Sequence, residues 1–290
     1  MTLPKARWLA DLERLLPIRS QFVISGSIRD SFLTPMASGS ALVPLLRALW
    51  ESLKGHNYRF LLVFDPVEGL RVYPDEQAPR ELAERLFDLK LSKGYQQMSL
   101  ESLTNVMKNL TVQRDARCAL VLDFASRMTR QVAHLAEGEH RFFVAAEKMS
   151  LNAAPIVPLP ASSAEGGGSP QYNPVLWLVN RGQDLPSWFT IDSERVASLV
   201  IGKPDFETRQ AAANQLAPLF AGFADASADA RDKFVKQFSE GTEGMTLTAL
   251  SDITELADRQ KLGIADIDDA VRCYKVGALD NPWRKDYLRE

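Results

Sequence analysis

Short apolar segments alternate with amphipathic helical patterns over the first two thirds of this 290-residue chain, and beyond residue 205 only helical patterns remain. The apolar segments have the length of buried strands, and they lack the alternation expected of a sheet with one face in water. They lie at 21–24, 58–64, 118–122, 175–180 and 196–201. Apolar strands separated by helices predict a parallel sheet covered on both faces. We therefore expect an α/β core followed by a small all-α domain.

The helical patterns set the expected boundaries of this organisation. Helices are predicted at 5–16, 41–54, 78–90, 98–112 and 129–149 in the first part, and at 205–220, 229–239, 246–260 and 265–275 in the second. The segment 152–173 is rich in Pro, Ser, Gly and Ala, which is typical of a long loop. We place the α/β core at 1–202, the helical domain at 203–280 and a connector tail at 281–290.

Composition excludes several classes of function. The chain has 34 basic and 37 acidic residues and a net charge of −3, so it has no strong overall attraction for nucleic acid or an anionic membrane. Its two cysteines and three histidines show no ligand spacing, so we predict no metal site. Neither a secretory signal nor a run of about 20 apolar residues is present. We expect a cytoplasmic protein in a reducing compartment.

Polar residues follow two of the predicted strands. Asp123 comes directly after the strand 118–122, and Asn180-Arg181 ends the strand 175–180. In nucleotide-binding sheets, a carboxylate at the carboxyl end of a strand lies at the ligand crevice, where it can orient Mg²⁺. The sequence therefore indicates a candidate nucleotide site at this edge of the sheet.

The second part of the chain adds three further motifs, and their order resembles that of the AAA+ ATPases. It opens with 202–209 (GKPDFETR), continues through 242–250 (TEGMTLTAL) and ends near 267–270 (IDDA). The resemblance covers most of residues 118–277 and is most specific in the helical lid. It implies that Asp123 matches the Walker B aspartate and that Asn180 matches the sensor-1 position.

The chain departs from this family where phosphate chemistry takes place. No G-x-x-x-x-G-K-[ST] string exists, and the segment in its place is 24–30 (ISGSIRD), with a single glycine and no lysine. Phe124 stands where family members have the glutamate that polarises the attacking water. The lid contains no recognisable sensor-2 arginine. The chain thus resembles a degenerate, Walker A-deficient N-terminal AAA domain of a bacterial tandem-AAA protein, and we do not expect it to hydrolyse ATP.

Each candidate residue has a functional and a structural interpretation. Gly26, Ser27 and Arg29 could bind an anion, or they could form an ordinary turn. Asp123 could hold a nucleotide-bound metal, or it could cap the next turn or pair with Arg127.

Two further candidates lie elsewhere in the sequence. Asn180 and Arg181 could sense a phosphate or reach a neighbouring subunit, and the alternative is a strand-end turn. Lys93-Gly94-Tyr95 could grip a polypeptide as a pore loop, whereas a surface tyrosine beside a helix break is the commoner arrangement.

Three functions remain open from the sequence. The first is a non-hydrolysing assembly or regulatory domain that packs in a ring, supports an active ATPase domain or recruits a substrate. The second is a divergent ATPase that binds ATP or ADP with Mg²⁺, although we expect no cofactor. The third is a nucleotide-free docking scaffold. The partners expected are further copies of the chain, a second AAA domain, and a protein substrate or adaptor.

Overall fold

The computed structural model describes residues 5–37, 39–91, 94–156, 169–191 and 193–276. They form two compact units, each of which draws on separated parts of the sequence. The first unit, which we call the sheet unit, contains residues 4–28 and 46–201. The second, which we call the helical unit, contains residues 29–45 and the chain from 202 onward. The expected tail at 281–290 lies outside the described residues.

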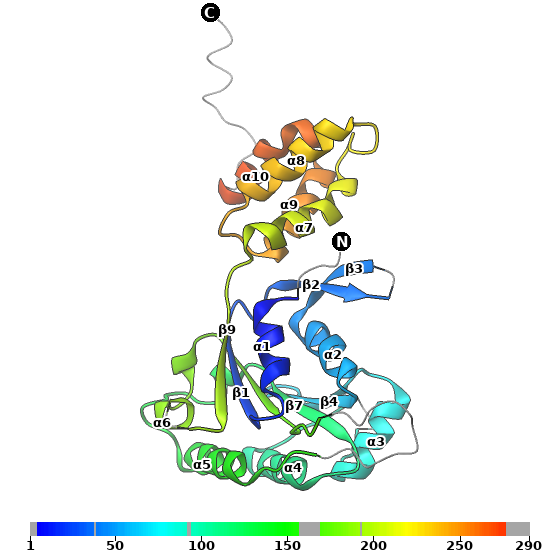
Figure 1. Cartoon of the computed structure of the whole chain (residues 1–290). Helices are drawn as coiled ribbons and strands as arrows, with labels where there is room; N and C mark the ends of the chain where they lie inside the picture. The colour runs from blue at the N-terminus through cyan, green and yellow to red at the C-terminus, as the bar shows by residue number, and fades with distance from the viewer. Residues whose placement is uncertain (1–4, 38, 92–93, 157–168, 192, 277–290) are drawn as a thin grey trace, which may run out of the picture. The chain divides into compact units, whose positions relative to one another are not determined.

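A seven-stranded sheet forms the centre of the sheet unit, with the strand order β6-β5-β4-β7-β8-β1-β9. Figure 1 labels β4, β7, β1 and β9 of this sheet. Its strands are β1 (Gln21–Gly26), β4 (Tyr58–Asp65), β5 (Gly69–Tyr73), β6 (Tyr95–Gln96), β7 (Arg117–Leu122), β8 (Val175–Val179) and β9 (Val196–Ile201). Strands β4, β7, β8, β1 and β9 run parallel to one another, as the apolar segments predict. Strands β5 and β6 are antiparallel additions at one edge, which the apolar segments did not reveal.

Helices cover both faces of this sheet. Figure 1 shows α3 (Gln77–Phe87), α4 (Leu100–Val112) and α5 (Glu137–Asn152) together on one side, and α1 (Arg7–Leu15) and α2 (Leu45–Gly55) on the other. Every residue of β7 and of β8 is buried, which explains why their sequences are continuously apolar. The expected α/β fold is confirmed. No helix within the described ranges is long and apolar enough to cross a membrane.

An aromatic cluster anchors α5 and the short helix α6 (Ser187–Thr190) to strand β8. The Trp177 ring stacks on Phe143 with a centroid separation of 5.6 Å and meets Phe189 edge-on at 5.0 Å. The indole N–H donates to the Gln21 side-chain oxygen at 2.9 Å, so the buried ring leaves no polar atom unpaired. This packing fixes the strands whose carboxyl ends carry the candidate site.

The helical unit contains α7 (Phe206–Leu216), α8 (Ala228–Gly241), α9 (Leu247–Arg259) and α10 (Ile267–Val276). Their apolar faces share one core, in which Phe220, Phe234 and Phe238 make mutual aromatic contacts. Three of the helices begin at a side-chain cap: Asp205 before α7, Ser227 before α8 and Thr246 before α9. The predicted helical region after residue 205 is confirmed.

A β-hairpin completes the helical unit and corrects one prediction. Strands β2 (Ser31–Met36) and β3 (Gly39–Pro44) pair antiparallel, with Leu33 opposite Leu42, and both leucines pack against the helical core. The predicted helix at 41–54 is therefore wrong over its first residues, because α2 begins only at Leu45. Pro44 disfavours the helical conformation at the preceding Val43, which suits an extended strand there.

The predicted helix at 129–149 also begins too early, because α5 starts at Glu137. The Glu139 side chain accepts the backbone N–H of Ala136 at 2.9 Å and so marks the true helix start. Part of the predicted loop at 152–173 lies outside the described residues. On either side of that gap, Ile156 and Gln171 form an isolated antiparallel bridge.

Candidate functional site

The candidate site lies at the carboxyl edge of the parallel strands in the sheet unit. Gly26 ends β1, Asp123 follows β7, and Asn180 follows β8. Strands β1, β7 and β8 are parallel and consecutive across the sheet, so the fold brings these three predicted residues to one edge. Ligands of open α/β sheets bind at such an edge. Arg29, in contrast, belongs to the helical unit.

The turn after β1 is packed tightly between its neighbours. Gly26 has a φ of +99°, and a Cβ atom there would lie 2.3 Å from the Ile201 carbonyl oxygen. The Gly26 N–H donates to the Asn180 carbonyl at 3.2 Å, and the Ser27 N–H donates to the Ile201 carbonyl at 2.9 Å. The next N–H, that of Ile28, turns back to the Gly26 carbonyl at 2.8 Å. Three successive N–H groups are thus bonded to main-chain oxygens.

A phosphate-binding loop needs the opposite arrangement, in which free N–H groups point at the ligand from a loop that opens a helix. The structure has β2 from Ser31 in the place of that helix. Gly26 therefore allows a close backbone approach between β1 and β9, and this is a structural role for the glycine.

Asp123 and Phe124 form the turn that follows β7. The Asp123 N–H continues the sheet by donating to the Phe64 carbonyl at 2.8 Å, and the carboxylate accepts the Phe124 N–H at 2.8 Å. Phe124 has a φ of +50°, which is uncommon for an aromatic residue, and its side chain is 48% exposed. Asp123 thus caps the turn, as the structural interpretation predicts. An aromatic ring has no group that could activate a water.

Ser126 and Asp184 join the ends of β7 and β8. The Ser126 hydroxyl accepts the Asn180 N–H at 2.7 Å and donates to the Asp184 carboxylate at 2.7 Å. The same carboxylate accepts the Arg181 N–H at 2.9 Å. This network holds the Asn180-Arg181 turn through its backbone, while both side chains remain exposed.

Neither Ser126 nor Asp184 stood out in the sequence. The available signal was an acidic residue three positions after Arg181, a spacing at which a side chain caps backbone N–H groups. The hydroxyl partner from the neighbouring strand end leaves no comparable trace.

The proposed substrate loop lies at the far lateral edge of the sheet. Lys93 is outside the described residues, Gly94 has a φ of +83°, and Tyr95 is 45% exposed at the start of β6. Five strand spacings separate β6 from β1 in the sheet order, a distance of about 24 Å at the usual spacing. Tyr95 is therefore not part of the same site as Gly26.

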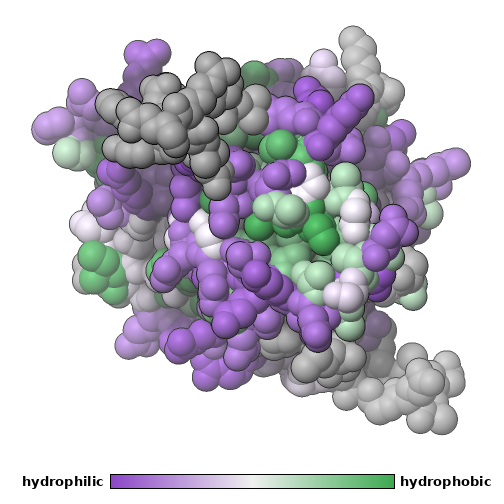
Figure 2. All heavy atoms as spheres, turned by 90° about the horizontal axis from the view of Figure 1, so that it is seen from above, coloured by the Kyte–Doolittle hydropathy of each residue, from purple (hydrophilic) through white to green (hydrophobic). Residues whose placement is uncertain are grey.

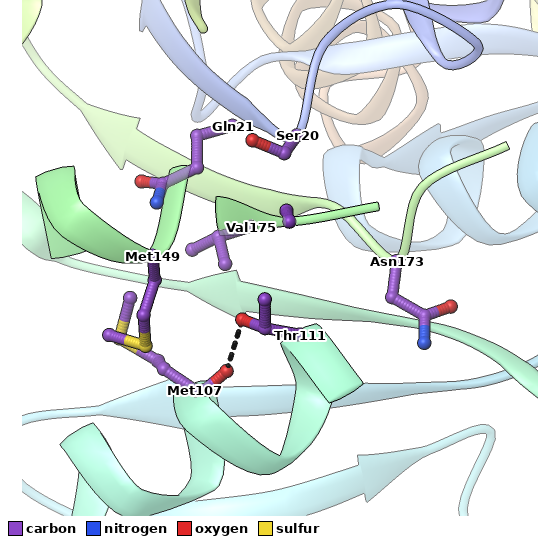
Figure 3. Close-up of a pocket in the computed structure, with 8 residues that line it drawn as sticks. Ser20, Gln21, Met107, Thr111, Met149, Asn173 and Val175 are labelled. Carbon is purple, nitrogen blue, oxygen red and sulfur yellow. Dashed lines mark hydrogen bonds between the residues drawn. The ribbon is translucent and has the colours of Figure 1, made fainter. Parts of the chain in front are cut away.

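A small pocket lies at the opposite, amino edge of the sheet, between α4 and α5 (Figure 3). Its polar lining groups are already bonded within the protein. The Ser20 hydroxyl donates to the Ser150 carbonyl at 3.1 Å, the Gln21 amide donates to the Ala146 carbonyl at 2.7 Å, and Thr111 bonds back to Met107 at 2.9 Å. Two methionine side chains supply much of the remaining lining. We interpret this pocket as a packing gap.

Comparison with known proteins adds a family match. The model of the family described as "AAA+ chaperone, N-terminal Rossmann-like domain" matches residues 3–202, which is more than half of the chain. The sequence matches no curated protein. Among solved structures, a chain of the HORMA:CdnC:Trip13 complex of E. coli MS115-1 is similar, with 14% identity and a TM-score of 0.48 over 93% of this chain and 78% of that chain.

Proposed function

Since this chain belongs to the family of AAA+ chaperone N-terminal Rossmann-like domains, we propose that it is a non-hydrolysing module that works through protein contacts. It would pack against further copies or against a second AAA domain, support an active ATPase domain, and recruit a protein substrate or adaptor. This assignment needs no nucleotide bound at the sheet edge.

The observation that carries the proposal is the closed turn after β1. Phosphate binding by backbone requires donors that are not already used. The N–H groups of Gly26, Ser27 and Ile28 all have carbonyl partners within the sheet unit. A phosphate at this turn would have to break those bonds, and no lysine of a phosphate loop would compensate for them.

The residues around the turn support the same conclusion. The Asp123 carboxylate bonds to its own turn, and Phe124 occupies the water-activating position. The rival function, a divergent ATPase acting through Gly26, Arg29, Asp123 and Asn180, would lack both a general base and a free phosphate cradle. It therefore has less support than the nucleotide-independent module.

Exposed apolar side chains are consistent with a protein-binding role. In the helical unit the large hydrophobic residues Phe206, Leu219, Tyr274 and Val276 are 40, 60, 39 and 72% exposed. Figure 2 shows hydrophobic residues gathered in one area of a mostly hydrophilic face. Apolar areas rimmed by polar residues mark interaction sites in many soluble proteins.

Calorimetric titration with ATP and with ADP, both with Mg²⁺, tests the proposal. We expect no binding heat and no change in the melting temperature, and we expect Asp123→Ala to behave in the same way. Light scattering on the same nucleotide-free samples should detect assembly of the chain or capture of its AAA partner domain. Micromolar nucleotide binding that is lost in Asp123→Ala would overturn the proposal and favour the divergent ATPase.

A further inference from the structure

Asp30 is a buried carboxylate at the start of the β2–β3 hairpin, within the helical unit. Only 8% of the surface of Asp30 is exposed. One carboxyl oxygen accepts the Thr248 N–H at 2.9 Å, the Thr248 hydroxyl at 3.1 Å and the Ser31 N–H at 2.7 Å. The other accepts the Leu247 N–H at 3.1 Å. Both oxygens are therefore engaged, and three of the four donors come from the first turn of α9.

These bonds place an anion at the N-terminus of a 13-residue helix. The first N–H groups of a helix have no partner inside it, and the helix dipole gives that end a partial positive charge. In α9 the cap residue Thr246 accepts the Ala249 N–H at 3.2 Å, and Asp30 accepts the two that precede it. The position that an external anion would favour is filled by a side chain of the protein.

The hairpin depends on such contacts. A two-stranded hairpin is marginally stable by itself in water. Beyond Asp30, the Ser31 N–H donates to the Thr248 hydroxyl at 3.0 Å, and the Gln215 amide donates to the Ser40 carbonyl at 2.9 Å. Leu33 and Leu42 add apolar contact with the helical core. Most of these polar contacts join Asp30 and Ser31, at the start of the hairpin, to the first turn of α9, so we expect them to hold the hairpin in place.

We propose that Asp30 is an internal anionic latch, which holds the β2–β3 hairpin on α9 and maintains the helical unit in one conformation without a nucleotide. Loss of the latch frees the hairpin and uncovers the apolar surface under Leu33 and Leu42. This inference goes beyond the proposed function, because it assigns a conformational role to Asp30, the last residue of the segment 24–30 that stands in place of a phosphate loop.

Hydrogen exchange on the full chain tests the latch. In Asp30→Asn the charge and one acceptor position are lost, and we expect the amides of residues 32–43 to exchange about tenfold faster or more, since charge-assisted bonds at a buried site are removed. Thr248→Val keeps the shape of the side chain but removes the hydroxyl, and it should give a smaller increase at the same amides. Asp65→Asn is the control, because Asp65 also accepts two backbone N–H groups but lies in a turn of the sheet unit. It should leave residues 32–43 unchanged.

Unchanged exchange in both Asp30→Asn and Thr248→Val would overturn the latch. If Asp30→Asn fails to fold, Thr248→Val alone decides the question. Mg-ATP added to the wild-type chain should not alter exchange in 32–43, and a slowing there would refute the claim that the latch acts without nucleotide. Nucleotide binding detected by calorimetry with unchanged hairpin exchange would contradict the proposed function and leave the latch standing.

Discussion

Gly26 offers the sharpest test of the closed turn, through the substitution Gly26→Ala. The new Cβ would lie 2.3 Å from the Ile201 carbonyl oxygen and 3.2 Å from the carbonyl carbon. Both atoms are main chain, so no side-chain rotation can relieve the contact. The residue would also keep a φ of +99°, a conformation that L-amino acids rarely adopt.

The expected destabilisation follows from two effects. Backbone strain at positive φ costs about 1–2 kcal/mol for a residue with a Cβ. Separation of the two strand ends would also break the bond from the Ser27 N–H to the Ile201 carbonyl, which contributes about 1 kcal/mol. Together we expect the free energy of unfolding of the sheet unit to fall by about 2–3 kcal/mol, against a typical total of about 5–15 kcal/mol.

Urea denaturation followed by tryptophan fluorescence measures this change. Trp8, Trp50, Trp177 and Trp188 all lie in the sheet unit, so the signal reports mainly on that unit. Gly182→Ala is the matched control, because a Cβ there would meet nothing within 4 Å. We expect the control to change stability by no more than about 0.5 kcal/mol. If Gly26→Ala proves as stable as Gly182→Ala, the turn is not closed, and a phosphate cradle at Gly26 becomes credible again.

Two further predictions concern a helix cap and a buried thiol. Asp205→Ala should destabilise the helical unit by about 1 kcal/mol, because the Asp205 carboxylate accepts the Thr208 N–H at the start of α7, whereas Asp205→Asn should cost less. Bonding to Thr208 lowers the pKa of Asp205. The stabilisation from this carboxylate should therefore be present above the unfolded pKa of about 4 and be lost as the pH falls through the lower folded pKa. Urea midpoints at pH 3 and pH 6 measure this, and an equal effect of Asp205→Ala at both pH values would contradict it. Burial raises the pKa of the Cys118 thiol, so in a Cys273→Ser background a thiol reagent should react with Cys118 only after unfolding, and rapid labelling of the native protein would contradict this.

The sheet could be predicted from sequence because its central strands are buried on both faces. In β7 and β8 every side chain faces protein, so the apolar runs give the strands directly. The β2–β3 hairpin could not be predicted in this way. The apolar residues from Leu42 to Leu49 also suit the spacing of a helix, and only the distant pairing of Leu33 with Leu42 selects a strand for the first of them.

The candidate site, like the fold, could be predicted from the sequence only in part. Strand-end residues such as Asp123 and Asn180 could be assigned to one edge, because parallel strands end together. Their bonding partners could not be assigned, since the Ser126 hydroxyl and the Ile201 carbonyl come from other turns and strands. The role of Asp30 was missed for a similar reason, because its partners at Leu247 and Thr248 lie more than 200 residues away in the chain.

The discontinuous make-up of the helical unit has a consequence for the order of folding. During synthesis the hairpin leaves the ribosome before residues 46–201, and its helical partners follow only after the whole sheet has been made. Contacts over such sequence separations form slowly, because a long loop must first close. Until α9 is complete, Leu33 and Leu42 have no helical core to cover them. A fragment cut at residue 202, where the family match ends, would therefore contain the sheet unit and the hairpin strands but lack the helical core that covers Leu33 and Leu42.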